Sequence, residues 1–154
     1  MIKGIPEKAG DRLADAALTW LGTPYVHNAK AKGYGADCGH LAIGAAEDAG
    51  IIKKNSVNAP NLATDWHLHK NREIMRELVA AYCIEVTGKP LMRGDILLYQ
   101  YGRVSSHVGI YIGNNEVIHS YVGRGVVVSP ITDTLFFMRN GTSRLRHVFR
   151  LGGE

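Results

Sequence analysis

The sequence has 154 residues, of which 45% are hydrophobic and 21% are charged, and its formal net charge is +4. This composition is typical of a globular protein with its own core, and we expect one domain over residues 1–154. No basic run favours nucleic acid, no apolar run approaches membrane-spanning length, and the first residues lack a secretory signal. We therefore expect synthesis in the cytoplasm, with neither a nucleic-acid nor a membrane partner.

The first helix is expected over residues 6–21, followed by Gly22 and Pro24, which end it. Trp20 is expected in the core. Tyr25 follows in a loop, where its ring could simply pack or its hydroxyl could serve a site formed by the next element. The apolar residues at helical spacing are Leu13, Ala14, Ala17, Leu18 and Leu21.

Cys38 is the first candidate for chemistry. A glycine-rich loop leads to Asp37 and Cys38, and the small residues of 41–50 favour a helix, so Cys38 lies at or near a helix start with Asp37 as N-cap. Unpaired N–H groups there are expected to lower the pKa of the thiol. The alternative is a buried structural cysteine. Histidines in later strands favour the nucleophile. His40 points to a different side of the helix and is not assigned as a base.

Residues 53–70 are expected to form an ordered loop that carries Asp65, Trp66, His67 and His69. The His-x-His spacing could bind a metal ion, but no further ligand lies at a recognisable spacing. We therefore favour an exposed or substrate-facing loop.

A third helix is expected after Asn71, which would be its cap, and Cys83 lies at its end without a nucleophilic context. The two cysteines do not form a disulfide framework, although one bridge between them stays possible. The apolar stripe of this helix is expected to be core and consists of Ile74, Met75, Leu78, Val79 and Tyr82.

From residue 84 onward the pattern changes to short strands, and residues 113–115 are a hairpin signal. Helices that precede a meandering antiparallel sheet indicate an α+β fold with the helices packed on one side of the sheet. The expected strands are residues 84–86, 96–101, 107–112, 116–121, 126–128 and 145–149.

Five segments in order resemble the motifs of the NlpC-type cell-wall cysteine peptidases, which are papain-like α+β enzymes. The resemblance spans about residues 11–150. The segments 35–38, 64–66 and 120–127 are most similar to the subgroup encoded beside tail genes of phages and gene transfer agents. The five motif segments are Thr23-Pro24-Tyr25, Asp37-Cys38, Arg93-Gly94-Asp95, residues 106–111 and residues 117–120.

This resemblance implies that Cys38 is the nucleophile, His107 the general base, His119 the residue that orients His107, and Tyr25 a contributor to the oxyanion region. It implies no cofactor. The implied substrate is a peptide bond of peptidoglycan, of the D-glutamyl–diaminopimelate type, and phage tail proteins are implied partners.

Two departures concern the substrate pocket. The usual Asp-Cys-Ser-Gly-Leu reads Asp-Cys-Gly-His-Leu from Asp37, and the usual Trp-Gly-Gly reads Val26-His27-Asn28. Neither departure changes the nucleophile.

The chemistry also follows from the residue types. His107 takes the thiol proton to give an ion pair, backbone N–H groups at the helix start stabilise the oxyanion, and His119 accepts from the far nitrogen of His107. Three alternatives stay open: an N-acetylmuramoyl-L-alanine amidase, a zinc-binding module that uses Cys38, His107 and His119, and an inactive tail-assembly scaffold.

The two histidines can touch only if their side chains share one face of the hairpin. A two-residue loop at residues 114–115 would place His107 and His119 on opposite faces. A three-residue loop, or another loop or bulge of the same parity, pairs Gly109 with His119 and makes the histidines diagonal neighbours. We predict this parity, with a left-handed Asn115 and with space for substrate beside Gly109. The opposite, buried face would carry Val108, Ile110, Ile112 and Ile118.

Overall fold

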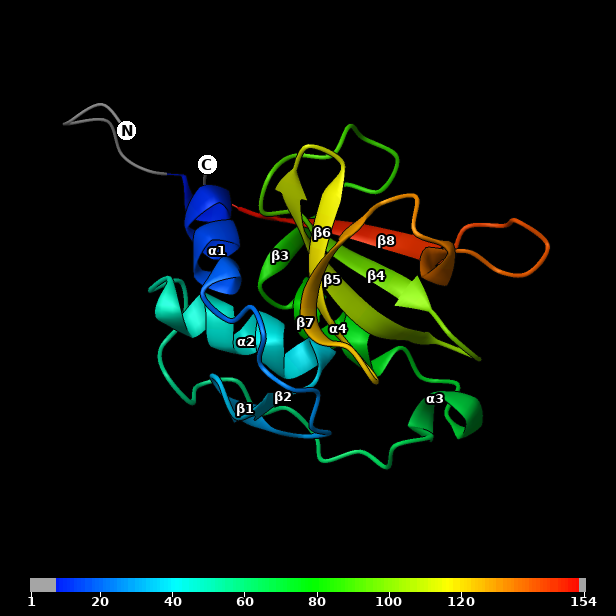
Figure 1. Cartoon of the computed structure of the whole chain (residues 1–154), viewed down its shortest axis with the longest axis horizontal. Helices are drawn as coiled ribbons and strands as arrows, with labels where there is room; N and C mark the ends of the chain where they lie inside the picture. The colour runs from blue at the N-terminus through cyan, green and yellow to red at the C-terminus, as the bar shows by residue number, and fades with distance from the viewer. Residues whose placement is uncertain (1–7, 153–154) are drawn as a thin grey trace.

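The computed structural model describes residues 8–152. The helices come first, as expected, and the strands of the main sheet follow (Figure 1). Residues 6–7 of the first expected helix lie outside the described residues. The helices are α1 (Ala9–Leu18), α2 (Cys38–Asp48), α3 (Trp66–His69) and α4 (Ile74–Ala80), and a small pair of strands, β1 (Lys30–Ala31) and β2 (Gly35–Ala36), precedes α2.

One antiparallel sheet forms the second half of the chain, with the strand order β3-β8-β4-β5-β6-β7. The expected meander is confirmed from β4 to β7. It is wrong for the last strand, because β8 inserts between β3 and β4. The strands are β3 (Cys83–Glu85), β4 (Ile96–Gln100), β5 (Ser105–Gly113), β6 (Glu116–Tyr121), β7 (Gly125–Pro130) and β8 (Leu145–Leu151).

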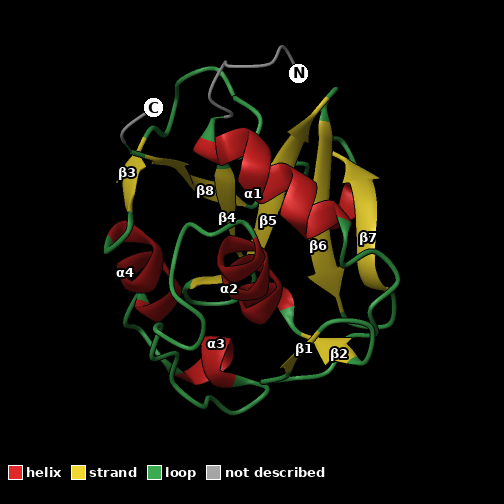
Figure 2. Ribbon diagram, turned by 90° about the vertical axis from the view of Figure 1, so that its left-hand side faces the viewer, coloured by secondary structure: helices red, strands yellow, loops and turns green. Residues whose placement is uncertain are grey.

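The helices α1, α2 and α4 cover one face of this sheet (Figure 2). Leu13 of α1 and Leu41 of α2 meet Ile110 and Ile118 of the sheet in the larger core cluster. Burying such apolar side chains is the main favourable contribution to folding. A smaller cluster on the other face includes Phe136 of a short 3₁₀ helix (Thr134–Phe136). The α+β architecture expected from the order of the elements is confirmed.

Trp20 fixes the contact between the first two helices. Its side chain is buried, as expected, and its indole N–H donates to Asp48 Oδ2 at 2.9 Å. A Cβ on Gly44 would lie 2.3 Å from the ring, so only glycine lets α2 approach this closely.

The Arg93-Gly94-Asp95 motif docks α1 onto the sheet. Gly94 has φ +96°, and a Cβ there would lie 2.2 Å from the Cα of Gly10, so no other residue fits. Asp95 is buried and accepts from both Nε and Nη2 of Arg150, at 2.8 and 2.9 Å. Such a paired geometry compensates for the burial of the carboxylate.

The helix α4 differs from expectation. Asn71 is not its N-cap, since the helix begins after Glu73, which makes no side-chain cap bond. None of its residues is buried. The apolar stripe that we expected in the core lines a cavity, although Met75 and Val79 are also partly buried against the core. Helical spacing identifies an apolar face but does not tell whether protein or open space lies opposite.

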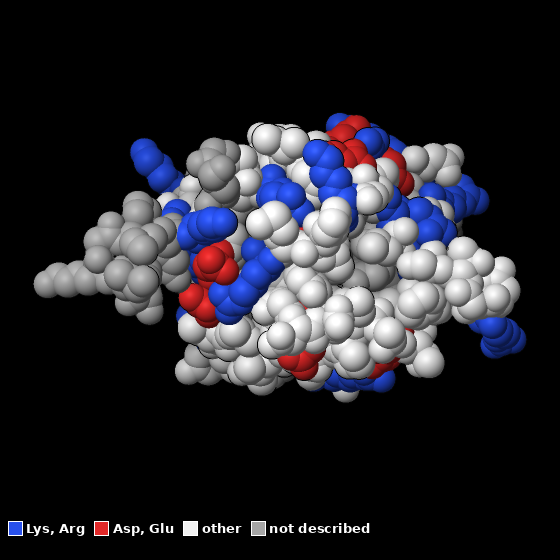
Figure 3. Space-filling model, turned by 90° about the horizontal axis from the view of Figure 1, so that it is seen from above, with Lys and Arg blue, Asp and Glu red and all other residues white. Residues whose placement is uncertain are grey.

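Within residues 8–152, no helix combines the length and the apolar character needed to cross a bilayer. On the face shown in Figure 3, some basic side chains lie beside acidic ones, others stand apart, and uncharged surface separates these groups. That face therefore carries no continuous basic stripe of the kind that tracks a nucleic-acid backbone.

Candidate active site

Cys38 is the first residue of α2, as expected. Asp37 is the N-cap and has an extended backbone with φ −87°, and its Oδ1 accepts from the backbone N–H of His40 at 2.8 Å. This capping bond satisfies one of the free N–H groups at the helix start. The backbone of Cys38 is thereby held in a fixed position at the end of the helix.

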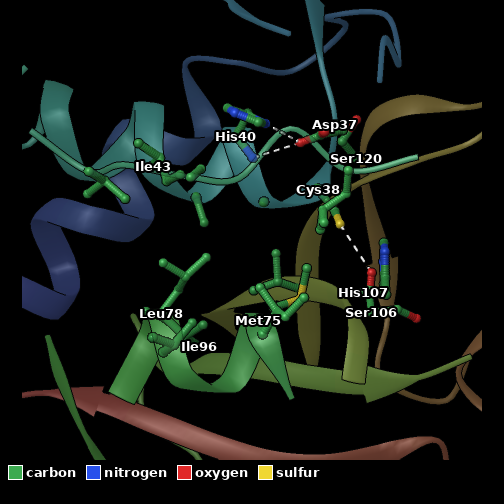
Figure 4. A pocket seen from close by; sticks show the side chains of 18 of the residues that line it. Asp37, Cys38, His40, Ile43, Met75, Leu78, Ile96, Ser106, His107 and Ser120 are labelled. Carbon is green, nitrogen blue, oxygen red and sulfur yellow. Dashed lines mark hydrogen bonds and ion pairs between the residues drawn. The ribbon is translucent and has the colours of Figure 1, made fainter. Parts of the chain in front are cut away.

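The thiol of Cys38 is buried, with 8% of the residue exposed. Its sulfur lies 3.7 Å from the carbonyl oxygen of Ser106, the residue before His107, and Figure 4 shows it pointing to that strand. Burial, followed by the charge of Asp37, raises the pKa of Cys38 to about 12. The N–H groups of Val108 and Gly39 act in the opposite direction without offsetting burial. The expectation of a lowered thiol pKa is therefore wrong, because desolvation exceeds the effect of the helix start.

The β5–β6 hairpin has the predicted parity through a different turn. Asn114 and Asn115 form a two-residue loop with φ +54° and +59°, and the register shifts between Tyr111 and Gly113. This bulge adds the extra residue that the three-residue loop was expected to supply. Gly109 pairs with His119, as predicted.

The two faces of the hairpin carry different side chains. The buried apolar face is confirmed for Val108, Ile110 and Ile118, while Ile112 is partly buried. The space expected beside Gly109 is absent, because a Cβ there would lie 2.4 Å from Cγ1 of Val117. The open space at His107 is the cavity that it lines together with Cys38.

His107 and His119 touch across the hairpin. Nε2 of His107 lies 2.8 Å from Nδ1 of His119. His107 is 7% exposed and His119 is fully buried. Burial, and then the charge of His119, lowers the pKa of His107 to about 3. Burial also lowers the pKa of His119 to about 4, although Asp133 acts against it. Both imidazoles are therefore neutral near pH 7.

A residue that sequence reasoning missed extends this contact. Ser129 of β7 lies 2.9 Å through its Oγ from Nε2 of His119. Only the pairing register of β6 and β7 could have identified Ser129 as a neighbour of His119. Val127 pairs with His119, and Ser129 lies two residues further along β7 on the same face. A lone serine in a strand carries no signal of its own.

The low pKa values of His107 and His119 predict acid destabilisation. Between pH 7 and 5 the unfolded chain takes up protons on both histidines at an ordinary pKa near 6.5, whereas the folded protein does not. The free energy of unfolding therefore decreases as the pH falls through this range. Glu85 does not contribute to this change, because its pKa of about 2 keeps the carboxylate charged throughout. We expect the thermal midpoint to fall by about 5 °C or more between these pH values.

Thermal melts of two variants test this assignment. His107→Gln should show a smaller fall in the midpoint than wild type, while His69→Gln, which changes an exposed histidine, should show the same fall. An equal fall in all three proteins would contradict it.

A cavity of about 360 Å³ adjoins the thiol. Cys38, His107 and Tyr25 line it together, and Met75 and Leu78 lie on the side opposite Cys38 (Figure 4). Burial, and then the charges of Cys38 and Asp37, raises the pKa of Tyr25, so its hydroxyl stays protonated. The structure thus brings Tyr25 to the same cavity as the two catalytic candidates. Its volume is in the range of small-ligand sites.

The residues that depart from the usual motif gather around Asp37. Nδ1 of His40 lies 2.8 Å from Asp37 Oδ1, and the backbone N–H of Asn28 donates to Oδ2 at 2.7 Å. His27 Nε2 lies 2.5 Å from the carbonyl oxygen of Leu62, so the turn that carries His27 and Asn28 also anchors the loop that walls the cavity. His40 therefore supports the N-cap.

The Asp65–His69 segment forms the short helix α3 instead of a plain loop. Trp66 and His67 line the cavity, in agreement with a substrate-facing position, while His69 Nε2 lies 3.1 Å from Asp65 Oδ2. Among the described residues, no group of three or more His, Cys, Asp or Glu side chains is arranged to hold a metal ion. Both cysteines are free.

Comparison with known proteins places these observations in a family. The model of the NlpC/P60 family matches residues 22–147, a segment that contains Tyr25, Cys38, His107, His119 and Ser129. The chain belongs to the NlpC/P60 family. Its fold is that of the papain-like domains of this family.

Curated relatives of this NlpC/P60 chain are named as peptidases. It is 36% identical over 59 residues to the Escherichia coli murein DD-endopeptidase MepS/murein LD-carboxypeptidase, a match that covers 38% of this chain and 31% of that protein. It is 25% identical over 130 residues to the probable endopeptidase NlpC of Escherichia coli, over 83% of this chain and 71% of the relative. The chain thus spans less than a third of the length of the first relative.

Solved structures agree on the fold. The NlpC/p60 domain of the peptidoglycan hydrolase SagA has a TM-score of 0.61 at 17% identity, and the match covers 92% of this chain and 98% of that domain. An NlpC/P60 family protein from Bacillus cereus has a TM-score of 0.63 at 22% identity, over 96% of this chain and 41% of that one. At these identities the likeness shows a shared fold alone.

Proposed function

We propose that this NlpC/P60 chain is a cysteine endopeptidase that hydrolyses an amide bond in the peptide stems of peptidoglycan. Cys38 is the nucleophile, His107 the general base, and His119 the residue that orients His107. The observation that carries the proposal is the buried contact between His107 and His119 at the cavity that holds the Cys38 thiol. A nucleophile and a base that line one cavity, with an orienting residue bonded to the base, are the parts that acyl transfer needs.

The proposed mechanism starts from a neutral pair, in contrast to the ion pair expected from the sequence. His107 uses Nε2 for His119, so Nδ1 is the nitrogen left for the thiol proton. As Sγ of Cys38 bonds to the amide carbon, the thiol proton passes to His107. The N–H of Cys38 and the hydroxyl of Tyr25 stabilise the oxyanion. His107 then protonates the leaving amine, the C–N bond breaks, and water hydrolyses the acyl-enzyme.

We further propose that the bond cut is the D-glutamyl–diaminopimelate bond and that the protein associates with a phage tail. Murein peptidases among the relatives support the substrate class. The segments that resemble the phage-associated subgroup support the second proposal, and Trp66 and Tyr121 of those segments line the cavity.

Digestion of purified muropeptides, with mass analysis of the products, tests this function. We expect products cut within the peptide stem, and release of the intact stem from the sugar would instead show the amidase. A chelator should leave the rate unchanged, because both ring nitrogens of His119 already contact other side chains. Folded protein that cuts no muropeptide would favour the inactive scaffold, and loss of structure on chelation would favour the zinc module.

A further inference from the structure

We infer that Ser129 is a positioning residue that sets the proton arrangement of His107 and His119. This inference rests on the proposed function, because it concerns the nitrogen that His107 presents to Cys38. Ser129 lies on β7, the edge strand of the sheet, and is not among the residues that line the cavity with the thiol. It acts only through His119.

The three side chains form a buried chain of two hydrogen bonds. Nε2 of His107 lies 2.8 Å from Nδ1 of His119, and Nε2 of His119 lies 2.9 Å from Oγ of Ser129. The exposed fractions of His107, His119 and Ser129 are 7%, 0% and 3%, so water does not compete for these two hydrogen bonds. Most buried polar atoms have a partner within the protein, and the loss of one is costly.

Two proton orders satisfy this chain, and only one is competent. In the first, His107 donates from Nε2 to His119, and His119 donates from Nε2 to Ser129, which leaves Nδ1 of His107 free to take the thiol proton. In the second, Ser129 donates to His119, and His119 donates from Nδ1 to His107. Neutral His107 then carries its proton on Nδ1, where it cannot accept another.

The surroundings of Ser129 favour the first order. Asp133 lies in the turn directly after β7, where its backbone N–H donates to the carbonyl of Pro130 at 2.9 Å. Its negative charge acts on His119, whereas Arg124, 3.6 Å from Asp133, acts in the opposite direction and only partly screens it. The charge of Asp133 shifts the pKa of His119 but not that of His107, so it draws the protons of the chain away from His107, toward His119 and Ser129. Ser129 supplies the acceptor that lets them lie there.

Removal of this acceptor should therefore change which ring nitrogens of His107 and His119 carry the protons. In Ser129→Ala, Nε2–H of His119 would be a buried donor without a partner, which is costly. His119 can lessen this cost by moving its proton to Nδ1, which produces the incompetent order. We expect kcat on the muropeptide to fall by about tenfold or more while KM changes by less than about twofold. Ser129→Thr keeps the hydroxyl, suits a strand, and should restore most of kcat.

Ser105→Ala is the matched control. Ser105 is as buried as Ser129 and also lies in the sheet, but its Oγ has no hydrogen-bond partner among the described residues. This variant removes a buried hydroxyl without touching the histidines, and its kcat should equal that of wild type.

Nitrogen-15 NMR of labelled histidines gives a readout that a purely structural role would not move. In wild type both His107 and His119 should carry the proton on Nε2, and in Ser129→Ala His119 should show Nδ1–H. Wild-type tautomers together with wild-type kcat in Ser129→Ala would overturn the inference. Nδ1–H on His119 in the wild-type protein would also overturn it, and this second test does not require the alanine variant to fold. Inactivity of every protein toward muropeptides, with the tautomer shift present, would count against the proposed function alone.

Discussion

Cys38→Ala is expected to reduce kcat for muropeptide hydrolysis by about 10⁴-fold or more, because the proposed acyl-enzyme forms on the sulfur of Cys38. The fold should persist. Alanine is favourable in a helix, and the N-cap bonds of Asp37 go to the backbone and to His40 rather than to the thiol. Circular dichroism and a thermal melt of the variant measure the fold, while product mass analysis measures the activity.

Cys83→Ala is the matched control for this substitution. Cys83 begins β3, and burial raises its pKa to about 11 without any charged or histidine partner. We expect this variant to retain wild-type kcat. Hydrolysis that survives Cys38→Ala, or is lost in Cys83→Ala, would refute the assignment of Cys38 as nucleophile.

His107→Gln is expected to lower kcat by about 10³-fold, since a glutamine amide cannot accept the thiol proton. The side chain still fills much of the space and can donate to Nδ1 of His119, so KM should change little. Rates measured at saturating and at low muropeptide concentration separate these two effects.

His69→Gln serves as the control for the loss of a histidine as such. His69 is exposed, and its side chain contacts Asp65, the N-cap residue of the same short helix. Its kcat should match that of wild type. A small effect of His107→Gln, comparable to that of His69→Gln, would remove His107 from the proposed mechanism.

The sequence was most informative where local rules act alone. The helix start at Cys38, the cap at Asp37 and the alternation of His107 and His119 follow from short-range geometry, and each is confirmed in the structure. The parity of the hairpin could be predicted because a one-residue slip would reverse every side chain. The device that provides this parity, a bulge in place of a longer loop, could not be predicted, because both give the same pairing.

The failures share a physical origin in contacts that are distant along the chain. The high pKa of the Cys38 thiol arises from burial by several elements together, which a helix start does not reveal. The open apolar face of α4 depends on what lies opposite it in space. The contact of Ser129 with His119 depends on the pairing of β7 with β6. The insertion of β8 between β3 and β4 likewise follows from no local pattern.

The neutral, buried thiol of Cys38 has a consequence for oxidative damage. Peroxides attack the thiolate, and a thiol that is 8% exposed with a pKa of about 12 offers almost none at pH 7. Conversion to sulfenic acid and to the irreversible higher acids should therefore be slow in the resting protein. Under the proposed mechanism the nucleophile loses its proton only during the attack on a bound amide, so we expect it to be protected from peroxides between turnovers.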